Sequence, residues 1–301
     1  MKQYHKLLED ILEHGEEVND RTGVGTKSIF GYQMRFNLQD GFPAVTTKRL
    51  AWKSVVGELI WFLEGSTDER RLAELTYAKD RTELVGRTTI WTANADAQGK
   101  SLGYYNNNER KMLGPVYGYQ WRNFGGDYHT DALPGESGFD QIEWLLNEIR
   151  TNPDSRRLIL SAWNPPSLHK MALPPCHYAF QFRVINGKLN CMLMMRANDV
   201  FLGAPFNIAS YALLIHIFAR ETGLNVGELV YSIGDAHIYL NHIDQVKEQL
   251  SRDEYSLPVL EIDNSFNLTD RLEHGFDIDT VDMFTLKNYQ HHGTIKAPMA
   301  V

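Results

Sequence analysis

The chain has 301 residues, of which 43% are hydrophobic and 23% are charged, a composition typical of a folded globular protein. Its formal net charge of −8 gives no basic footprint, so we expect no nucleic-acid partner. The charged N-terminus lacks a signal-peptide core, and no run of about 18 apolar residues occurs, so we expect a cytoplasmic chain with no membrane partner.

The first third of the chain shows helical and extended patterns in turn. Apolar residues at helical spacing over 7–12 predict an opening helix, and 27–38 is predicted to be a strand. The range 52–63 is a strongly apolar helical pattern with Glu58 in its middle, where an uncompensated carboxylate is costly. The range 81–126 is polar and irregular, but its aromatic residues and glycines indicate an ordered, functional loop.

The rest of the chain mixes helices and strands without regular alternation. We predict an exposed insertion over 127–138, helices over 141–151, 205–222 and 241–252, and strands over 157–163, 178–184, 188–195 and 227–233. Asn186-Gly187 indicates a hairpin between the second and third of these strands. This order favours an α+β (mixed α/β) fold, and the chain shows no convincing linker between domains.

The strand predicted over 188–195, KLNCMLMM, is apolar on both faces. Such a strand has to be covered on each side, by a helix layer or by a second subunit.

The two cysteines, Cys176 and Cys191, are too few for a disulfide framework and have no histidines at ligand spacing, so we predict no metal site. Cys176 follows two prolines that fix how the chain enters a strand. This placement suits a nucleophile, provided that a nearby cation lowers its pKa. The alternative is a buried structural thiol, which fits Cys191, inside an apolar strand, better.

Four arginines are candidate anion ligands, and one of them, Arg196, closes a predicted strand. Arg156 and Arg157 open a predicted strand, where adjacent guanidinium groups suit bidentate anion capture or form a solvated, salt-bridged edge. Arg21 lies in a Gly-rich turn of the kind that can hold a phosphate, although the turn lacks the Walker lysine-serine spacing.

Three further side chains can contact a nucleoside. Asn207, near the start of a predicted helix, can pair with a base edge through one donor and one acceptor, or can cap the helix. His237 and Tyr239 are two residues apart, so in an extended segment both point to one face and can contact a ribose hydroxyl. Taken separately, each has an ordinary structural explanation.

Together, these segments closely resemble folate-dependent, non-flavin thymidylate synthase over essentially the whole chain. The resemblance is carried, in the family's order, by DRTGVGT, FPAVTTKRLAWKSVVGELIWFLEGST, LGPVYGYQWR, SRRLILSAWNP, ALPPCH, MRANDVFLGAPFNIASYALL, GDAHIYLNH and IKAPMAV. It implies a single domain over residues 1–301. This domain is expected to have a large mixed sheet, surrounded by helices and packed face to face against that of a second copy in a homodimer. It also implies an enzyme that methylates dUMP to dTMP with 5,10-methylenetetrahydrofolate, without metal or flavin.

The resemblance also implies chemical roles for individual residues. Cys176 looks like the nucleophile that adds to carbon 6 of uracil, with Arg196 as the cation beside it. Glu58, Tyr117 and His177 match a polar network that moves protons around the base.

The ligand contacts that the resemblance implies form two sets. The nucleotide set is Arg21 and Arg196 on the phosphate, Arg156 and Arg157 reaching the phosphate in the partner's site, Asn207 supported by Asp199 on the uracil edge, and His237 and Tyr239 on the deoxyribose. The folate set is a wall of Ile90, Trp91, Leu173, Asp199, Gly203 and Phe206, with Lys48 on the glutamate tail and Ala300 in a closing C-terminal flap.

Three positions depart from the family's usual pattern: Met195 replaces a glutamine, Ala197 a serine and Asn94 a tryptophan. They keep open a pyrimidine-nucleotide hydroxymethylase, which uses the same thiol and folate but adds water in place of hydride. Asn207 argues against that branch, because its cytosine-specific enzymes carry an aspartate at this position. Trp91 and the complete C-terminal KAPMAV favour hydride transfer, because closing the site keeps water away from the intermediate. A catalytically silent nucleotide-binding homologue is the other alternative, and the retained thiol of Cys176 argues against it.

Overall fold

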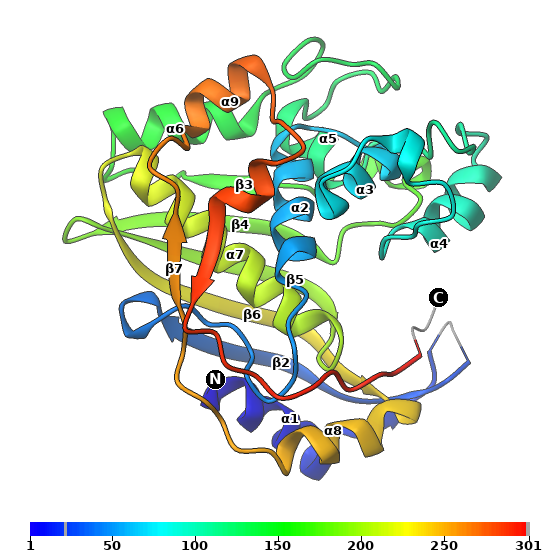
Figure 1. Ribbon diagram of the computed structural model, residues 1–301, viewed down its shortest axis with the longest axis vertical. Coiled ribbons are helices and arrows are strands. Elements are labelled where there is room, and N and C mark those ends of the chain that lie inside the picture. Colours follow the sequence, from blue (N-terminus) through cyan, green and yellow to red (C-terminus); the bar gives the residue numbers. More distant parts are fainter. Residues whose placement is uncertain (21–22, 299–301) are drawn as a thin grey trace.

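The fold is built on a mixed β-sheet (Figure 1). The computed structural model describes residues 1–20 and 23–298. Within this part of the chain, the strands follow the order β1 (Glu16–Val18), β2 (Thr26–Asn37), β6 (Asn225–Tyr239), β5 (Lys188–Asp199), β4 (His177–Ile185) and β3 (Ile159–Ser161). β5 and β6 run parallel and the other neighbours run antiparallel. This confirms the α+β class and the large mixed sheet.

Helices surround this sheet. They are α1 (Lys2–His14), α2 (Trp52–Leu63), α3 (Glu69–Tyr77), α4 (Thr92–Asn94), α5 (Tyr117–Arg122), α6 (Gln141–Thr151), α7 (Gly203–Glu221), α8 (Ile243–Leu250) and α9 (Leu268–His274). A separate ribbon pairs β7 (Val259–Ile262) with β8 (Phe284–Lys287). None of the described helices is both long and apolar enough to cross a membrane.

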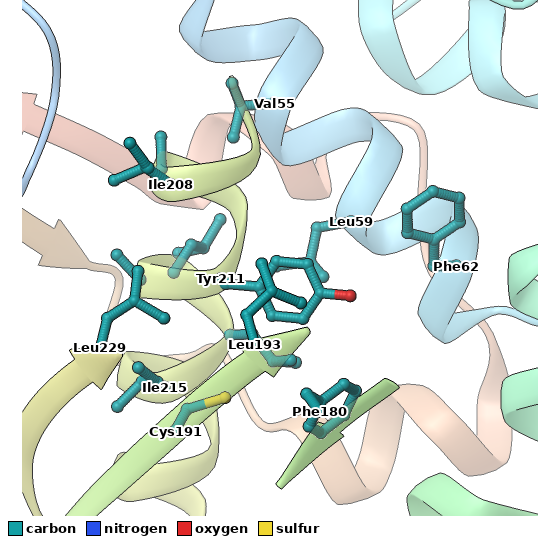
Figure 2. Packing of buried hydrophobic residues seen from close by; sticks show 14 of the residues in the cluster. Val55, Leu59, Phe62, Phe180, Cys191, Leu193, Ile208, Tyr211, Ile215 and Leu229 are labelled. Atoms are coloured by element: carbon teal, nitrogen blue, oxygen red, sulfur yellow. The ribbon is translucent and has the colours of Figure 1, made fainter. Parts of the chain in front are cut away.

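One face of the sheet packs against α7 and α2, and this packing forms the core (Figure 2). Alternate residues of β5, including Cys191 and Leu193, are at most 2% exposed, because every second side chain of a strand points to the same face. Figure 2 shows Tyr211 of α7, Leu59 of α2 and Leu193 of β5 among the residues of this core. Cys191 is therefore a core residue, as its apolar surroundings in the sequence indicated.

The opposite face of the sheet is apolar but only partly covered. Met192 and Met194 of β5 are half-buried, and Phe30 of β2 is 88% exposed. Phe30, Trp163, Tyr178 and Met194 line a groove of about 490 Å³ on this face. Helix α7 thus covers one face of β5, and cover of the other face by a second subunit stays a prediction.

The predicted elements agree with the structure to different degrees. The helices predicted over 52–63 and 141–151 match α2 and α6. The strand predicted over 227–233 is too short, since β6 continues to Tyr239 while it pairs with β2 and β5. The sequence patterns missed β1, α3, α9 and the β7–β8 ribbon, and they also missed the helices α4 and α5 inside the range 81–126, which was predicted to be an irregular loop. The insertion over 127–138 is mostly exposed, as predicted.

Candidate active site

A cavity of about 290 Å³ lies where the ends of β5 and β6 meet the start of α7. It brings together most of the residues selected from the sequence. They are Glu58, Ile90, Trp91, Tyr117, Leu173, Cys176, His177, Asp199, Gly203, Phe206, Asn207 and Tyr239, joined by Ala197, Asn198 and Leu202.

Cys176 is the residue immediately before β4, at the end of the Pro174-Pro175 turn. The Nη2 atom of Arg196 lies 3.5 Å from its Sγ. The turn orients this guanidinium group, because Arg196 donates from Nε to the carbonyl of Pro175 at 2.9 Å and from Nη2 to that of Pro174 at 3.0 Å. Burial raises the pKa of the Cys176 thiol, and the charge of Arg196 opposes that rise. The cation that a nucleophilic cysteine needs is therefore in place.

Tyr117 and His177 form the floor beside the thiol. The Tyr117 hydroxyl oxygen accepts a hydrogen bond from the Cys176 backbone N–H at 2.6 Å. The Tyr117 and His177 rings stack with centroids 4.0 Å apart, and His177 Nδ1 lies 2.8 Å from the hydroxyl of Tyr211. Burial lowers the pKa of His177 to about 3, so the imidazole is neutral at ordinary pH.

Glu58 reaches the cavity from α2 and is only 4% exposed. Its Oε1 accepts a hydrogen bond from the Trp91 indole N–H at 2.7 Å. Burial raises the pKa of Glu58 to about 7, and the bond from Trp91 only partly opposes this rise. A carboxyl group with such a pKa can take up and release a proton near neutral pH.

Asn207 lies inside α7, which begins at Gly203, so the alternative of a helix cap is wrong. Its Oδ1 accepts a hydrogen bond from Asn198 Nδ2 at 3.2 Å. The Asn198 Oδ1 in turn accepts from the Tyr231 hydroxyl at 2.8 Å. Neither Asn198 nor Tyr231 was predicted from the sequence. The pattern that could have indicated Asn198 is the pair of polar residues, Asn198 and Asp199, at the end of an apolar strand.

Asp199 holds the turn between β5 and α7. Its Oδ1 accepts from the backbone N–H groups of Phe201 and Leu202, each at 3.0 Å. These bonds satisfy two donors before the helix starts and fix the position of Gly203 and the residues that follow.

His237 and Tyr239 lie at the end of β6. The segment is extended there, which is the condition under which both side chains were predicted to point to one face. Their rings lie 5.2 Å apart, and Tyr239 lines the cavity. Asp235 stands beside them, with its Oδ2 3.3 Å from Nδ1 of His237 and its Oδ1 accepting from the hydroxyl of Ser28.

Three other predicted ligands, Lys48, Arg156 and Arg157, do not line the cavity. Lys48 is 7% exposed and points inward, where Nζ donates to the carbonyl of Phe201 and lies 3.6 Å from the centre of the Phe201 ring. Arg156 and Arg157 are exposed just before β3. Arg21 and Ala300 lie outside the described residues.

A buried ion pair on α3 holds the segment that carries Ile90 and Trp91, and the sequence patterns did not reveal it. Glu69 and Arg70 are 0% and 3% exposed. Thr89 and Thr92 donate their hydroxyl groups to Glu69 Oε1, while Arg70 donates to the carbonyl groups at positions 84 and 87.

The apolar wall of the cavity, Ile90, Trp91, Leu173 and Phe206, can stack against a planar ligand. Within the described part of the chain, no three His, Cys, Asp or Glu residues gather in a way that could hold a metal ion. In a comparison with known protein families, the family model described as thymidylate synthase matches residues 2–301.

Proposed function

Because the chain belongs to the thymidylate synthase family, we propose that it methylates dUMP to dTMP, with 5,10-methylenetetrahydrofolate as the one-carbon and hydride donor. The observation that carries this proposal is one cavity holding the Cys176 thiol beside Arg196, the amide of Asn207 and the buried carboxyl group of Glu58. These groups supply a nucleophile, a base reader and a proton carrier.

The reaction begins at Cys176. Its thiolate, favoured by the adjacent guanidinium of Arg196, forms a bond to carbon 6 of uracil. The electron pair of the 5,6 double bond moves toward carbonyl 4 and leaves carbon 5 nucleophilic. Glu58, with its pKa of about 7, is suited to exchanging a proton at that oxygen.

Later steps need a proton removed from carbon 5 and the thiolate released from carbon 6. Tyr117 is the candidate for assisting the first of these, because its hydroxyl lies against the Cys176 backbone. The folate co-substrate supplies the one-carbon unit and the hydride, and the wall of Ile90, Trp91, Leu173 and Phe206 fits its flat ring system. The Lys48 ammonium group has to leave its contact with Phe201 before it can reach a folate tail.

We also propose that two copies pair through the exposed apolar face of the sheet. The support is the 88% exposure of Phe30 and the groove that it lines with Met194 and Tyr178. Large exposed apolar patches mark interaction surfaces. In such a dimer, Arg156 and Arg157 are the residues that we expect to reach the phosphate in the partner's cavity.

Product analysis tests the proposed function. The purified protein is incubated with dUMP and 5,10-methylenetetrahydrofolate while dihydrofolate absorbance is followed and the nucleotide product is identified by mass spectrometry. We expect a methylated nucleotide and an equal amount of dihydrofolate. A hydroxymethylated nucleotide with tetrahydrofolate would contradict the proposal and direct attention to Ala197, Met195 and Asn94. Binding of dUMP without any product would indicate a silent homologue.

A further inference from the structure

Three polar side chains form a hydrogen-bonded row that begins in the core and ends at the half-buried, base-reading amide of Asn207. The Tyr231 hydroxyl donates to Asn198 Oδ1 at 2.8 Å, and Asn198 Nδ2 donates to Asn207 Oδ1 at 3.2 Å. Tyr231 is 0% exposed and Asn198 is 5% exposed. The three residues come from β6, β5 and α7, so the row exists only in the folded chain.

The row has a direction. A hydroxyl group that donates to the carbonyl oxygen of Asn198 leaves the amide nitrogen of that residue facing Asn207. Asn207 therefore presents its oxygen to Asn198 and its nitrogen on the other side. Reversal of the Asn207 amide would place two NH2 groups against each other in a buried site, which leaves a donor without an acceptor.

We propose that Asn198 determines base specificity by fixing the amide of Asn207 in the orientation that selects uracil over cytosine. This inference rests on the proposed function, because it takes Asn207 as the residue that reads the base. Uracil presents an N–H donor at position 3 and a carbonyl acceptor at position 4. Cytosine presents an acceptor at position 3 and an amine donor at position 4, so it requires the reversed amide.

Packing around the pair keeps it in place. A Cβ atom at Gly203 would lie 3.2 Å from Asn198 Nδ2 and 3.6 Å from Asn207 Oδ1, so the backbone of α7 closes directly over the contact. The next residue on β5, Asp199, fixes the turn that leads to Gly203. The two amides therefore have little room to separate or rotate.

The substitution Asn198→Asp makes the strongest test. Its carboxylate still accepts from the Tyr231 hydroxyl, but it offers Asn207 an acceptor in place of a donor, which favours the reversed amide. Tyr231→Phe removes only the hydroxyl that sets the direction of the row. Tyr4→Phe is a matched control, because it removes another fully buried hydroxyl, which donates to the carbonyl of Val200 in the adjoining turn. Asn190→Asp is the control on the same strand.

Dissociation constants for dUMP and dCMP are measured by titration calorimetry without folate, on variants with cooperative thermal unfolding. We expect the wild-type protein to bind dUMP about 100-fold or more tightly than dCMP. The substitution Asn198→Asp should lower this ratio of dissociation constants by at least about tenfold. Tyr231→Phe should narrow it by a smaller factor, and both controls should keep it. If Asn198→Asp fails to fold, Tyr231→Phe gives the same comparison.

The outcomes separate this inference from the proposed function. If the wild-type protein prefers dUMP, and if Asn198→Asp and Tyr231→Phe keep the same ratio of the dCMP to the dUMP dissociation constant, the role of Asn198 is overturned. The proposed function is then left intact. An unchanged protein that binds neither nucleotide overturns the proposed function and this inference with it.

Discussion

Trp91 donates its indole N–H to the carboxyl group of Glu58 across 2.7 Å, which joins the segment before α4 to the apolar helix α2. Because Glu58 is almost entirely buried, this bond only partly offsets the loss of hydration, and burial raises the pKa of Glu58 to about 7. The folded chain thus keeps an acid in its core that titrates near neutral pH.

This acid makes stability depend on pH. Between its ordinary pKa of 4.5 and the folded value of about 7, the folded protein holds a proton that the unfolded chain releases. The contribution of Glu58 to the free energy of unfolding therefore falls as pH rises through this window. Glu58→Gln keeps an acceptor for Trp91 but does not titrate.

We expect Glu58→Gln to be more stable than the unchanged protein at pH 8, by roughly 3 kcal/mol at most, and to differ little at pH 5. Urea unfolding at both pH values measures the difference, with the exposed Glu143→Gln as control. Equal differences at pH 5 and pH 8 would contradict a raised pKa. The variant should also lose turnover, because its amide cannot carry a proton.

The two cysteines should differ in reactivity and in function. Cys176 lines the cavity beside Arg196, whereas Cys191 is 1% exposed in the core. We expect Cys176→Ser to lower turnover by at least about 1,000-fold while dUMP still binds, because a serine hydroxyl is a far weaker nucleophile at neutral pH.

Cys191→Ser is the matched control, and it should keep turnover, although it buries a hydroxyl group in the core. Iodoacetamide followed by peptide mass spectrometry should label Cys176 more rapidly than Cys191, and dUMP should slow that labelling. Turnover that survives Cys176→Ser would show the nucleophile assignment to be wrong.

Local sequence patterns identified the parts of the site whose chemistry is unusual for their surroundings. Glu58 stood out as a carboxylate on an apolar helix, and Cys176 as a thiol after two prolines. Asn198 and Tyr231 did not stand out, because their roles arise from the parallel pairing of β5 with β6 and from the start of α7. Sequence spacing does not show such a contact.

The helices were likewise predicted where the local sequence pattern is distinctive and missed where it is not. Helix α2 was predicted with its observed bounds, because its apolar pattern is continuous. Helix α3 was missed because it buries charged residues, Glu69 and Arg70, which a hydrophobic pattern assigns to the solvent side.

That buried pair gives a third prediction. Arg70→Met removes the guanidinium group that bonds Glu69 and the carbonyl groups at positions 84 and 87, and so leaves the carboxylate of Glu69 unpaired in the core. Such a change costs on the order of 3–5 kcal/mol of unfolding free energy. We expect the loss to be measurable by urea denaturation.

The double variant Glu69→Gln/Arg70→Met should lose less than the sum of the two single variants, since it leaves no uncompensated charge. The exposed pair of Lys79 and Glu83 is the control, and removing Lys79 should change little. Additive losses at Glu69 and Arg70 would show that the two side chains act independently.

The proposed dimer gives the fourth prediction. Phe30→Glu places a charge on the exposed apolar face and should shift the protein from dimer to monomer in sedimentation velocity, with loss of turnover. Leu133→Glu is the control, because Leu133 is 68% exposed in the insertion over 127–138, away from the groove that Phe30 lines. A monomeric unchanged protein with full turnover would contradict the dimer.

Subunit mixing tests whether Arg156 and Arg157 act in the partner's cavity. A Cys176→Ser chain and an Arg156→Ala/Arg157→Ala chain are each expected to be inactive alone. When they are unfolded together and refolded, a mixed dimer combines both defects in one cavity and leaves the other cavity intact, because that cavity takes its thiol from one chain and its arginines from the other. Turnover should therefore return in the mixture. If both arginines served their own chain's cavity, every cavity in the mixed dimer would carry a defect, and mixing would restore nothing.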